Sequence, residues 1–117
     1  MGVTDHGLVG HEELTRAYEQ ASFWTYPCTD TETFCITALR AQLAGAVPVV
    51  LTRAGLDETV QHGYRCSERS AYLQTLLQAM ENAEQLSLED RQKMGVFVSQ
   101  DFSWDVIAAK WKALLNN

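Results

Sequence analysis

The sequence predicts an α/β fold, a three-stranded parallel sheet with about five helices, in one domain that spans residues 1–117. Short apolar segments alternate with longer segments of helical periodicity, and the run at residues 47–51 is apolar almost throughout. Continuous apolar character is typical of a strand covered on both faces. Strands that alternate with helices form parallel sheets through right-handed crossovers.

The first three elements are expected before Pro27. Residues 3–8 are weakly strand-like, and residues 11–20 follow helical spacing, with acids in the first turn where the helix dipole favours them. Residues 22–26 are rich in aromatic and β-favouring side chains and end at the proline, so they predict a buried strand.

The middle of the chain predicts a second crossover. A helix is expected over residues 34–44, capped by Thr31 or Thr33 and ended by Gly45. The apolar strand at residues 47–51 follows directly, so these elements extend the alternation of strand and helix.

The remaining elements are helical. A short turn is expected at residues 57–61 and an amphipathic helix at residues 70–82. Ser87-Leu88-Glu89-Asp90 is a capping signal for a helix at residues 88–100, and a last helix starts at Ser103-Trp104-Asp105. Together the elements describe the back half of a Rossmann-like domain, whose ligands bind at the carboxyl ends of the strands.

Composition excludes several classes of function. The net charge is −6 and the nine basic residues are scattered, which argues against nucleic-acid binding. The longest apolar run, residues 44–51, is too short to span a bilayer, and the first residues lack the regions of a signal peptide, so we expect a cytoplasmic protein. No cofactor or metal site is expected, because the three cysteines form no CxxC pair and fit free thiols in a reducing compartment.

Residues 26–50 carry a specific pattern. A strand ends in Pro27 and is followed by Glu32-Thr33-Phe34-Cys35-Ile36, a helix, and Ala41-Gln42-Leu43-Ala44-Gly45-Ala46-Val47-Pro48-Val49-Val50. This segment resembles the donor-site motif of family-4-type retaining glycosyltransferases, which have the GT-B fold. Ala54-Gly55-Leu56-Asp57-Glu58 is similar to the Gly-Gly-Leu-x-Glu loop of that family, and Phe102-Ser103-Trp104 to the start of its C-terminal helix.

The resemblance implies a nucleotide-sugar site at the start of the helix over residues 34–44. Helix N-termini bind diphosphates, and the backbone donors here come from Phe34, Cys35 and Ile36. In the family the first Glu, matched by Glu32, contacts the donor sugar. The further candidates for donor binding are Thr33, which lies within the motif, His6, Arg40 and Glu58. Each also has a plainer interpretation, Glu32 as a helix-terminal acid and His6, Arg40 and Glu58 as surface residues.

Two departures from the family pattern affect the ligand site. Arg40 replaces the second Glu, which receives the ribose hydroxyls, and an arginine has no acceptor for them. Cys35 replaces a glycine. The acceptor domain and the first half of the donor domain have no counterpart in this sequence, so we expect no catalytic residue and no transferase activity from the chain alone.

Three hypotheses for function therefore stay open. The chain binds a nucleotide or nucleotide-sugar weakly, or it is a self-association or protein-interaction module that has lost the ligand site, or a complementary chain supplies the missing half. For self-association we expect a homodimer through an edge strand at Gly2 to Gly7, because that strand would lack a neighbour.

Overall fold

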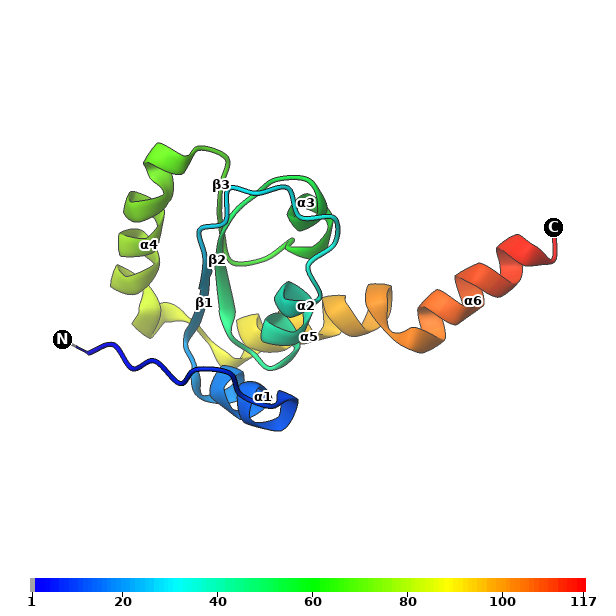
Figure 1. Cartoon of the computed structure of the whole chain (residues 1–117), viewed down its shortest axis with the longest axis horizontal. Helices are drawn as coiled ribbons and strands as arrows, with labels where there is room; N and C mark the ends of the chain where they lie inside the picture. Colours follow the sequence, from blue (N-terminus) through cyan, green and yellow to red (C-terminus); the bar gives the residue numbers. More distant parts are fainter. Residues whose placement is uncertain (1) are drawn as a thin grey trace.

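The central strand of the sheet is β2, Val47–Leu51, and all five of its residues are buried. In the computed structural model, which describes residues 2–117, β1 (Phe23–Tyr26) and β3 (Tyr64–Cys66) flank β2, and both pair with it in parallel (Figure 1). Phe23 lies opposite Val47 in the register. The α/β fold predicted from the sequence, with its three-stranded parallel sheet, is therefore confirmed.

Helices cover both faces of the sheet. One face carries α4, Tyr72–Glu81, and the other carries α2 (Ile36–Leu43), α3 (Gly55–Thr59) and α5 (Leu88–Phe102) (Figure 1). The helix α1, His11–Gln20, packs against α2. Short 3-10 turns at Arg69–Ala71 and Ala83–Gln85 precede and follow α4. This two-sided cover explains the continuous apolar character of β2.

The core lies between β2 and the helices α2 and α3. One cluster in it consists of the fully buried Ala38, Val50, Leu56 and Val60, and Trp24, Tyr26 and Cys35 pack against them. A buried polar side chain, Gln42, connects the two helices. Its Nε2 donates to the Ala38 carbonyl at 2.9 Å and to the Thr59 carbonyl at 2.8 Å, which fixes the end of α3 against α2.

The strand expected at residues 3–8, including the edge at Gly2 to Gly7, is wrong. Residues 2–10 have no regular secondary structure and are almost all exposed, with Val3 88% and Leu8 104% exposed. Asp5 accepts a hydrogen bond from the amide of Gly7 at 2.8 Å, which turns the chain locally. The two edge strands of the described sheet are β1, Phe23–Tyr26, and β3.

The third strand is instead Tyr64–Cys66, a segment for which the sequence predicts no strand. It is only three residues long and gives no alternating pattern, and its pairing with Val49, Val50 and Leu51 of β2 depends on the fold. Gly63 makes the pairing possible. With a φ of 86°, it lies so close to Pro48 that an added Cβ would be 2.5 Å from the Pro48 carbonyl oxygen.

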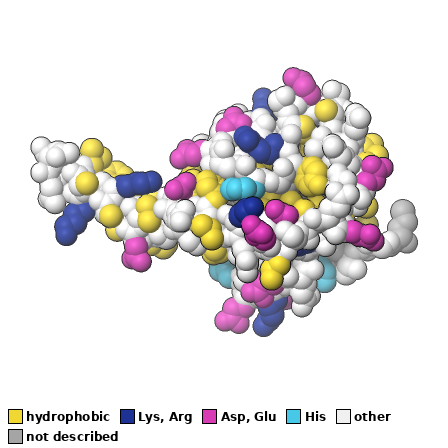
Figure 2. Space-filling model, turned by 180° about the vertical axis from the view of Figure 1, so that it is seen from behind, with side chains coloured by type: hydrophobic (Ala, Val, Ile, Leu, Met, Phe, Trp, Pro, Cys, Tyr) yellow, Lys and Arg dark blue, Asp and Glu magenta, His cyan; other side chains and the backbone are white. Residues whose placement is uncertain are grey.

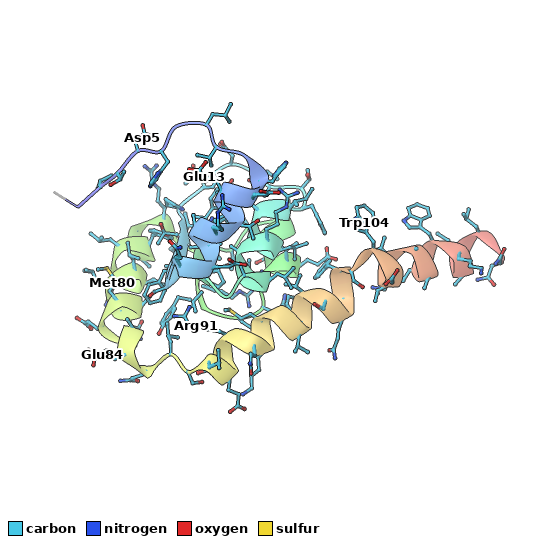
Figure 3. The ribbon with its side chains drawn as sticks, turned by 90° about the horizontal axis from the view of Figure 1, so that it is seen from below. Asp5, Glu13, Met80, Glu84, Arg91 and Trp104 are labelled. Carbon is cyan, nitrogen blue, oxygen red and sulfur yellow. The ribbon has the colours of Figure 1, made fainter. Side chains whose placement is uncertain are left out.

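The C-terminal helix α6, Trp104–Leu115, projects from the body and gives the molecule principal extents of 55 × 31 × 31 Å (Figures 1 and 3). Its expected start is confirmed, since the Ser103 hydroxyl accepts from the amide of Val106 at 3.4 Å. The expected capping box of α5 is also present between Ser87 and Asp90. Among residues 2–117, no helix has the length and apolar character needed to span a membrane.

Candidate functional site

Two loops meet beyond the carboxyl ends of β1 and β2, the place where a parallel sheet positions a ligand site. The first loop is residues 27–35 and the second is residues 52–54. The amide of Gly55 donates to the Glu32 carbonyl at 2.8 Å, and Nη1 of Arg53 donates to the Thr29 carbonyl at 2.7 Å. These two bonds hold the loops together as one unit.

The contact at Gly55 leaves no room for a side chain. A Cβ added to this residue would lie 2.6 Å from the amide nitrogen of Phe34 and 2.6 Å from the carbonyl oxygen of Thr33. Since these atoms belong to the backbone, they cannot rotate away as a flexible side chain can. Only glycine fits the contact between the loops.

Each loop also holds a residue with a positive φ that is not glycine. Cys35 has a φ of 68° and Ala54 a φ of 48°, and among the described residues they are the two non-glycine cases. Such a conformation costs of order 1–3 kcal/mol and persists only where the surrounding structure imposes it. Because the two loops also contact each other, we infer that the fold imposes this backbone conformation on both residues.

Glu32 is held from the sheet side. Its Oε1 accepts a hydrogen bond from the hydroxyl of Tyr26, the last residue of β1, and the Tyr26 ring stacks on Trp24 with centroids 5.0 Å apart. The hydrogen bond to Glu32 raises the pKa of Tyr26 above its usual value, and a hydrogen bond with Cys28 adds to the effect. A neutral tyrosine therefore positions the half-buried carboxylate of Glu32.

The helix α2 begins beside Glu32 without a side-chain cap. Cys35 is its N-cap residue, in place of the expected Thr31 or Thr33, and its thiol, which faces the amides of Ala38 and Thr37, makes no side-chain cap hydrogen bond. Thr33, Phe34 and Ile36 are exposed around this helix end. The amides of the first turn and the positive end of the helix dipole form an environment that favours an anion.

The thiol of Cys35 is not arranged as a nucleophile. Burial raises its pKa above the usual value, against the opposing effect of the Ala38 amide. Because the thiolate is the reactive form, a raised pKa keeps this sulfur unreactive near neutral pH. The arrangement at the start of α2 therefore suits binding, and this thiol adds no covalent chemistry.

Arg40 lies on a second surface, between α1 and α2. Its Nη1 is 3.0 Å from Nδ1 of His11, and both residues line a cavity of about 390 Å³ that Thr15 and Tyr18 also line. Burial raises the pKa of Tyr18, and the charge of Arg40 opposes that rise. When the guanidinium donates to Nδ1, the His11 proton is on Nε2, so both side chains offer donors to this cavity.

The remaining candidates lie apart from these surfaces. His6 is in the exposed N-terminal segment and lines a groove beside α1, where Glu13 and Arg16 also lie. Glu58 is exposed on α3, next to Asp57, whose carboxylate is 3.8 Å from the guanidinium of Arg65. The structure therefore brings together Glu32 to Ile36, and does not bring His6 or Glu58 into contact with them through any hydrogen bond or ion pair of the described residues.

Sequence reasoning missed Tyr26, Arg53 and His11, which position the loop and Arg40. Tyr26 is the last strand residue before a proline, and this place at the carboxyl end of a strand was the available signal. Neither a family model nor a curated protein matches this chain.

Proposed function

We propose that the chain is a glycosyltransferase-like half-domain of the GT-B fold that binds a nucleotide or nucleotide-sugar, with the diphosphate at the start of α2. The backbone of the two loops carries this proposal. The resemblance assigns glycine to the positions of Cys35 and Ala54, and both residues have the positive φ that glycine adopts without strain. The glycine pattern of the family thus corresponds to a backbone shape in this chain.

The chemistry of the loop supports the same ligand. In this proposal the amides of Ile36, the first residue of α2, and of Cys35, its N-cap, suit phosphate oxygens, because no side-chain cap hydrogen bond is made there, and Phe34 lies just before the helix. Glu32 is a carboxylate oriented by Tyr26, and such a group accepts hydrogen bonds from sugar hydroxyls. In this proposal Thr33 adds a hydroxyl at the rim.

Arg40 changes the expected ligand contacts. Together with His11 it presents donors where the family presents an acceptor for the ribose hydroxyls. We therefore expect Arg40 to contact a phosphate group and the ribose to be held poorly, so affinity is weak. His6 and Glu58 contribute at most from outside this loop. The chain alone is not a transferase, since catalysis requires an acceptor held against the donor.

Isothermal titration with UDP, GDP, ADP and their sugar conjugates tests the proposal. We expect binding of one nucleotide that Glu32→Ala weakens at least ~10-fold for the sugar conjugate, because a charge-assisted hydrogen bond is lost. Glu81→Ala, which removes an exposed acid at the end of α4, is the matched control and should leave binding unchanged. Absence of binding to all of them up to millimolar concentration would mean that the loop is an inherited scaffold without a ligand.

A specific observation favours self-association as a second function. The helix α6 exposes large apolar side chains, with Trp104 86% and Leu115 77% exposed, and β1 leaves one edge of the sheet open. A homodimer or a complementary chain would cover such surfaces. Pairing through Gly2 to Gly7 is disfavoured, because this segment forms no strand. The three free cysteines fit the reducing cytoplasm, where we place the protein.

A further inference from the structure

We propose that α6 of one copy of this chain docks into a groove along α5 of a second copy, and that the exchange is reciprocal, giving a two-fold symmetric dimer. The proposal uses no residue of the loops around Glu32 and does not depend on nucleotide binding. The proposal names the two surfaces, α6 and the groove along α5, through which two copies of the chain would associate.

The apolar residues of α6 form a seam. Trp104, Ile107, Trp111 and Leu114 follow one another at spacings of three, four and three residues, the pattern of a helix that packs lengthwise against another helix. Trp111 is 59% exposed and Leu114 65% exposed. Figure 2 shows hydrophobic side chains along the projecting helix, and Figure 3 shows Trp104 at its start, away from the body. Ile107 is half-buried, and the other three seam residues are exposed in the single chain.

The matching surface is a groove of about 610 Å³ between α5 and the end of α2. Most of its lining comes from one face of α5, at positions that recur every three or four residues, and the far wall is Leu43. At mid-groove α5 has Gly95, where an added Cβ would have only the Leu43 carbonyl oxygen within 4 Å, at 3.8 Å, so the floor is open. The apolar and small lining residues are Leu43, Leu88, Gly95, Val96 and Ser99.

The dimensions of groove and helix agree. The lining of α5 runs from Leu88 to Gln100, which at 1.5 Å per residue is about 18 Å. The helix α6 has 12 residues and the same length of about 18 Å. Small residues such as Gly95 and Ser99 allow helices to approach closely, so the groove accepts a helix with bulky side chains such as tryptophan.

The helix dipoles favour an antiparallel fit. An antiparallel α6 places its C-terminal end beside the first turn of α5 of the other copy, where the partial charges of the two helix ends are opposite. Among the described residues that line the groove, the charged one is Arg91, whose Nη1 donates to the Gly45 carbonyl at 2.7 Å. The rest of the chain holds twice as many acidic as basic residues, whereas α6 has two lysines and one acid, Asp105, so α6 and the body that it approaches carry opposite net charges.

The occupant must come from a second copy, because α6 cannot reach its own groove. A single residue outside the helices, Ser103, separates α5 from α6, with a φ of −63° and a ψ of 150°. Two antiparallel helices need a loop of roughly 2–5 residues between them. The short connection holds α6 away from α5 of the same chain, whereas two copies related by a two-fold axis satisfy both grooves at once.

The area is sufficient for a stable dimer. The two tryptophans of α6 alone expose on the order of 300 Å². Because the contact is made twice and each helix covers a comparable area of groove, the total reaches about 1,200 Å² before any other residue is counted. This is the lower bound of standard specific interfaces.

Sedimentation equilibrium of the full chain from about 1 to about 100 µM tests the proposal. We expect wild type to dimerise. Trp111→Glu in the seam and Gly95→Lys in the groove should each raise the dimer dissociation constant at least ~30-fold. Ala109→Glu, on the opposite face of α6, is the control and should dimerise like wild type. Circular dichroism checks that every variant keeps its helices.

Mixing the two defective variants distinguishes this contact from others. A Trp111→Glu chain keeps its groove and a Gly95→Lys chain keeps its seam, so together they should form a heterodimer that neither forms alone. A monomeric wild type at all concentrations would overturn the proposal. A Gly95→Lys chain that dimerises like wild type would overturn it as well, and would indicate pairing of the α6 seams or of the open β1 edge.

Discussion

Ala54 offers a direct measure of the strain stored in the loops. Its φ of 48° and ψ of −121° lie outside the regions that L-residues favour, and its side chain is exposed. Changing it to glycine relieves about 1–3 kcal/mol of strain, loses almost no packing, and costs about 0.4–1 kcal/mol through the larger entropy of the unfolded chain. We expect Ala54→Gly to stabilise the fold by about 1 kcal/mol.

Urea denaturation followed by circular dichroism measures this change. At a typical slope of about 2 kcal/mol/M, the midpoint should rise by about 0.5 M. Ala17→Gly is the control, since Ala17 is also exposed but lies inside α1, where glycine should destabilise by about 0.5–1 kcal/mol. The two substitutions should therefore have opposite signs. If Ala54→Gly destabilises as much as Ala17→Gly, the backbone of this loop is not strained.

Three further predictions concern packing and pH. Gly55→Ala should destabilise by at least ~3 kcal/mol and abolish any nucleotide binding, because its Cβ would lie 2.6 Å from the Thr33 carbonyl oxygen. Thermal melting and titration of the same sample check both effects. Gln42→Ala should cost about 2 kcal/mol in urea denaturation, because it leaves the Thr59 carbonyl unpaired in the core and opens a cavity, while it also removes the buried Gln42 Oε1, which has no hydrogen-bond partner among the described residues. Asp90 has a lowered pKa, first because of its hydrogen bond with the Ser87 side chain. The stability it adds is therefore present above its usual value of 3.8 and lost as the pH falls through the lowered pKa. The difference in melting temperature between wild type and Asp90→Asn should shrink over that acidic range, and a constant difference would contradict the role of the carboxylate.

The sequence predicted the elements whose signals are local. The capping box at Ser87 and the apolar run of β2 are such signals, and both are present. The strand expected at residues 3–8 did not form, since a strand needs a neighbour and this segment has none. In contrast, β3 exists because β2 supplies its partner, although three residues give no pattern of their own.

The same distinction holds for the candidate site. Glu32 to Ile36 are consecutive, so their shared position at the start of α2 could be predicted. The pairing of Arg40 with His11 joins side chains that are 29 residues apart, and no local pattern encodes it. The positive φ angles of Cys35 and Ala54 do not follow from the residue types, which usually avoid them, and the glycines of the resembling family at both positions were the available signal.

The tight contact at Gly55 limits how the two loops around Glu32 can change by mutation. The loop over residues 27–35 presents exposed side chains at Thr33 and Phe34, and substitutions there alter what a ligand meets without disturbing the contact. Gly55, which follows the second loop, has no such freedom, since any side chain there would separate the two loops. The exposed positions can therefore acquire new ligand preferences, while Gly55 is restricted to preserving the shape that makes those preferences possible.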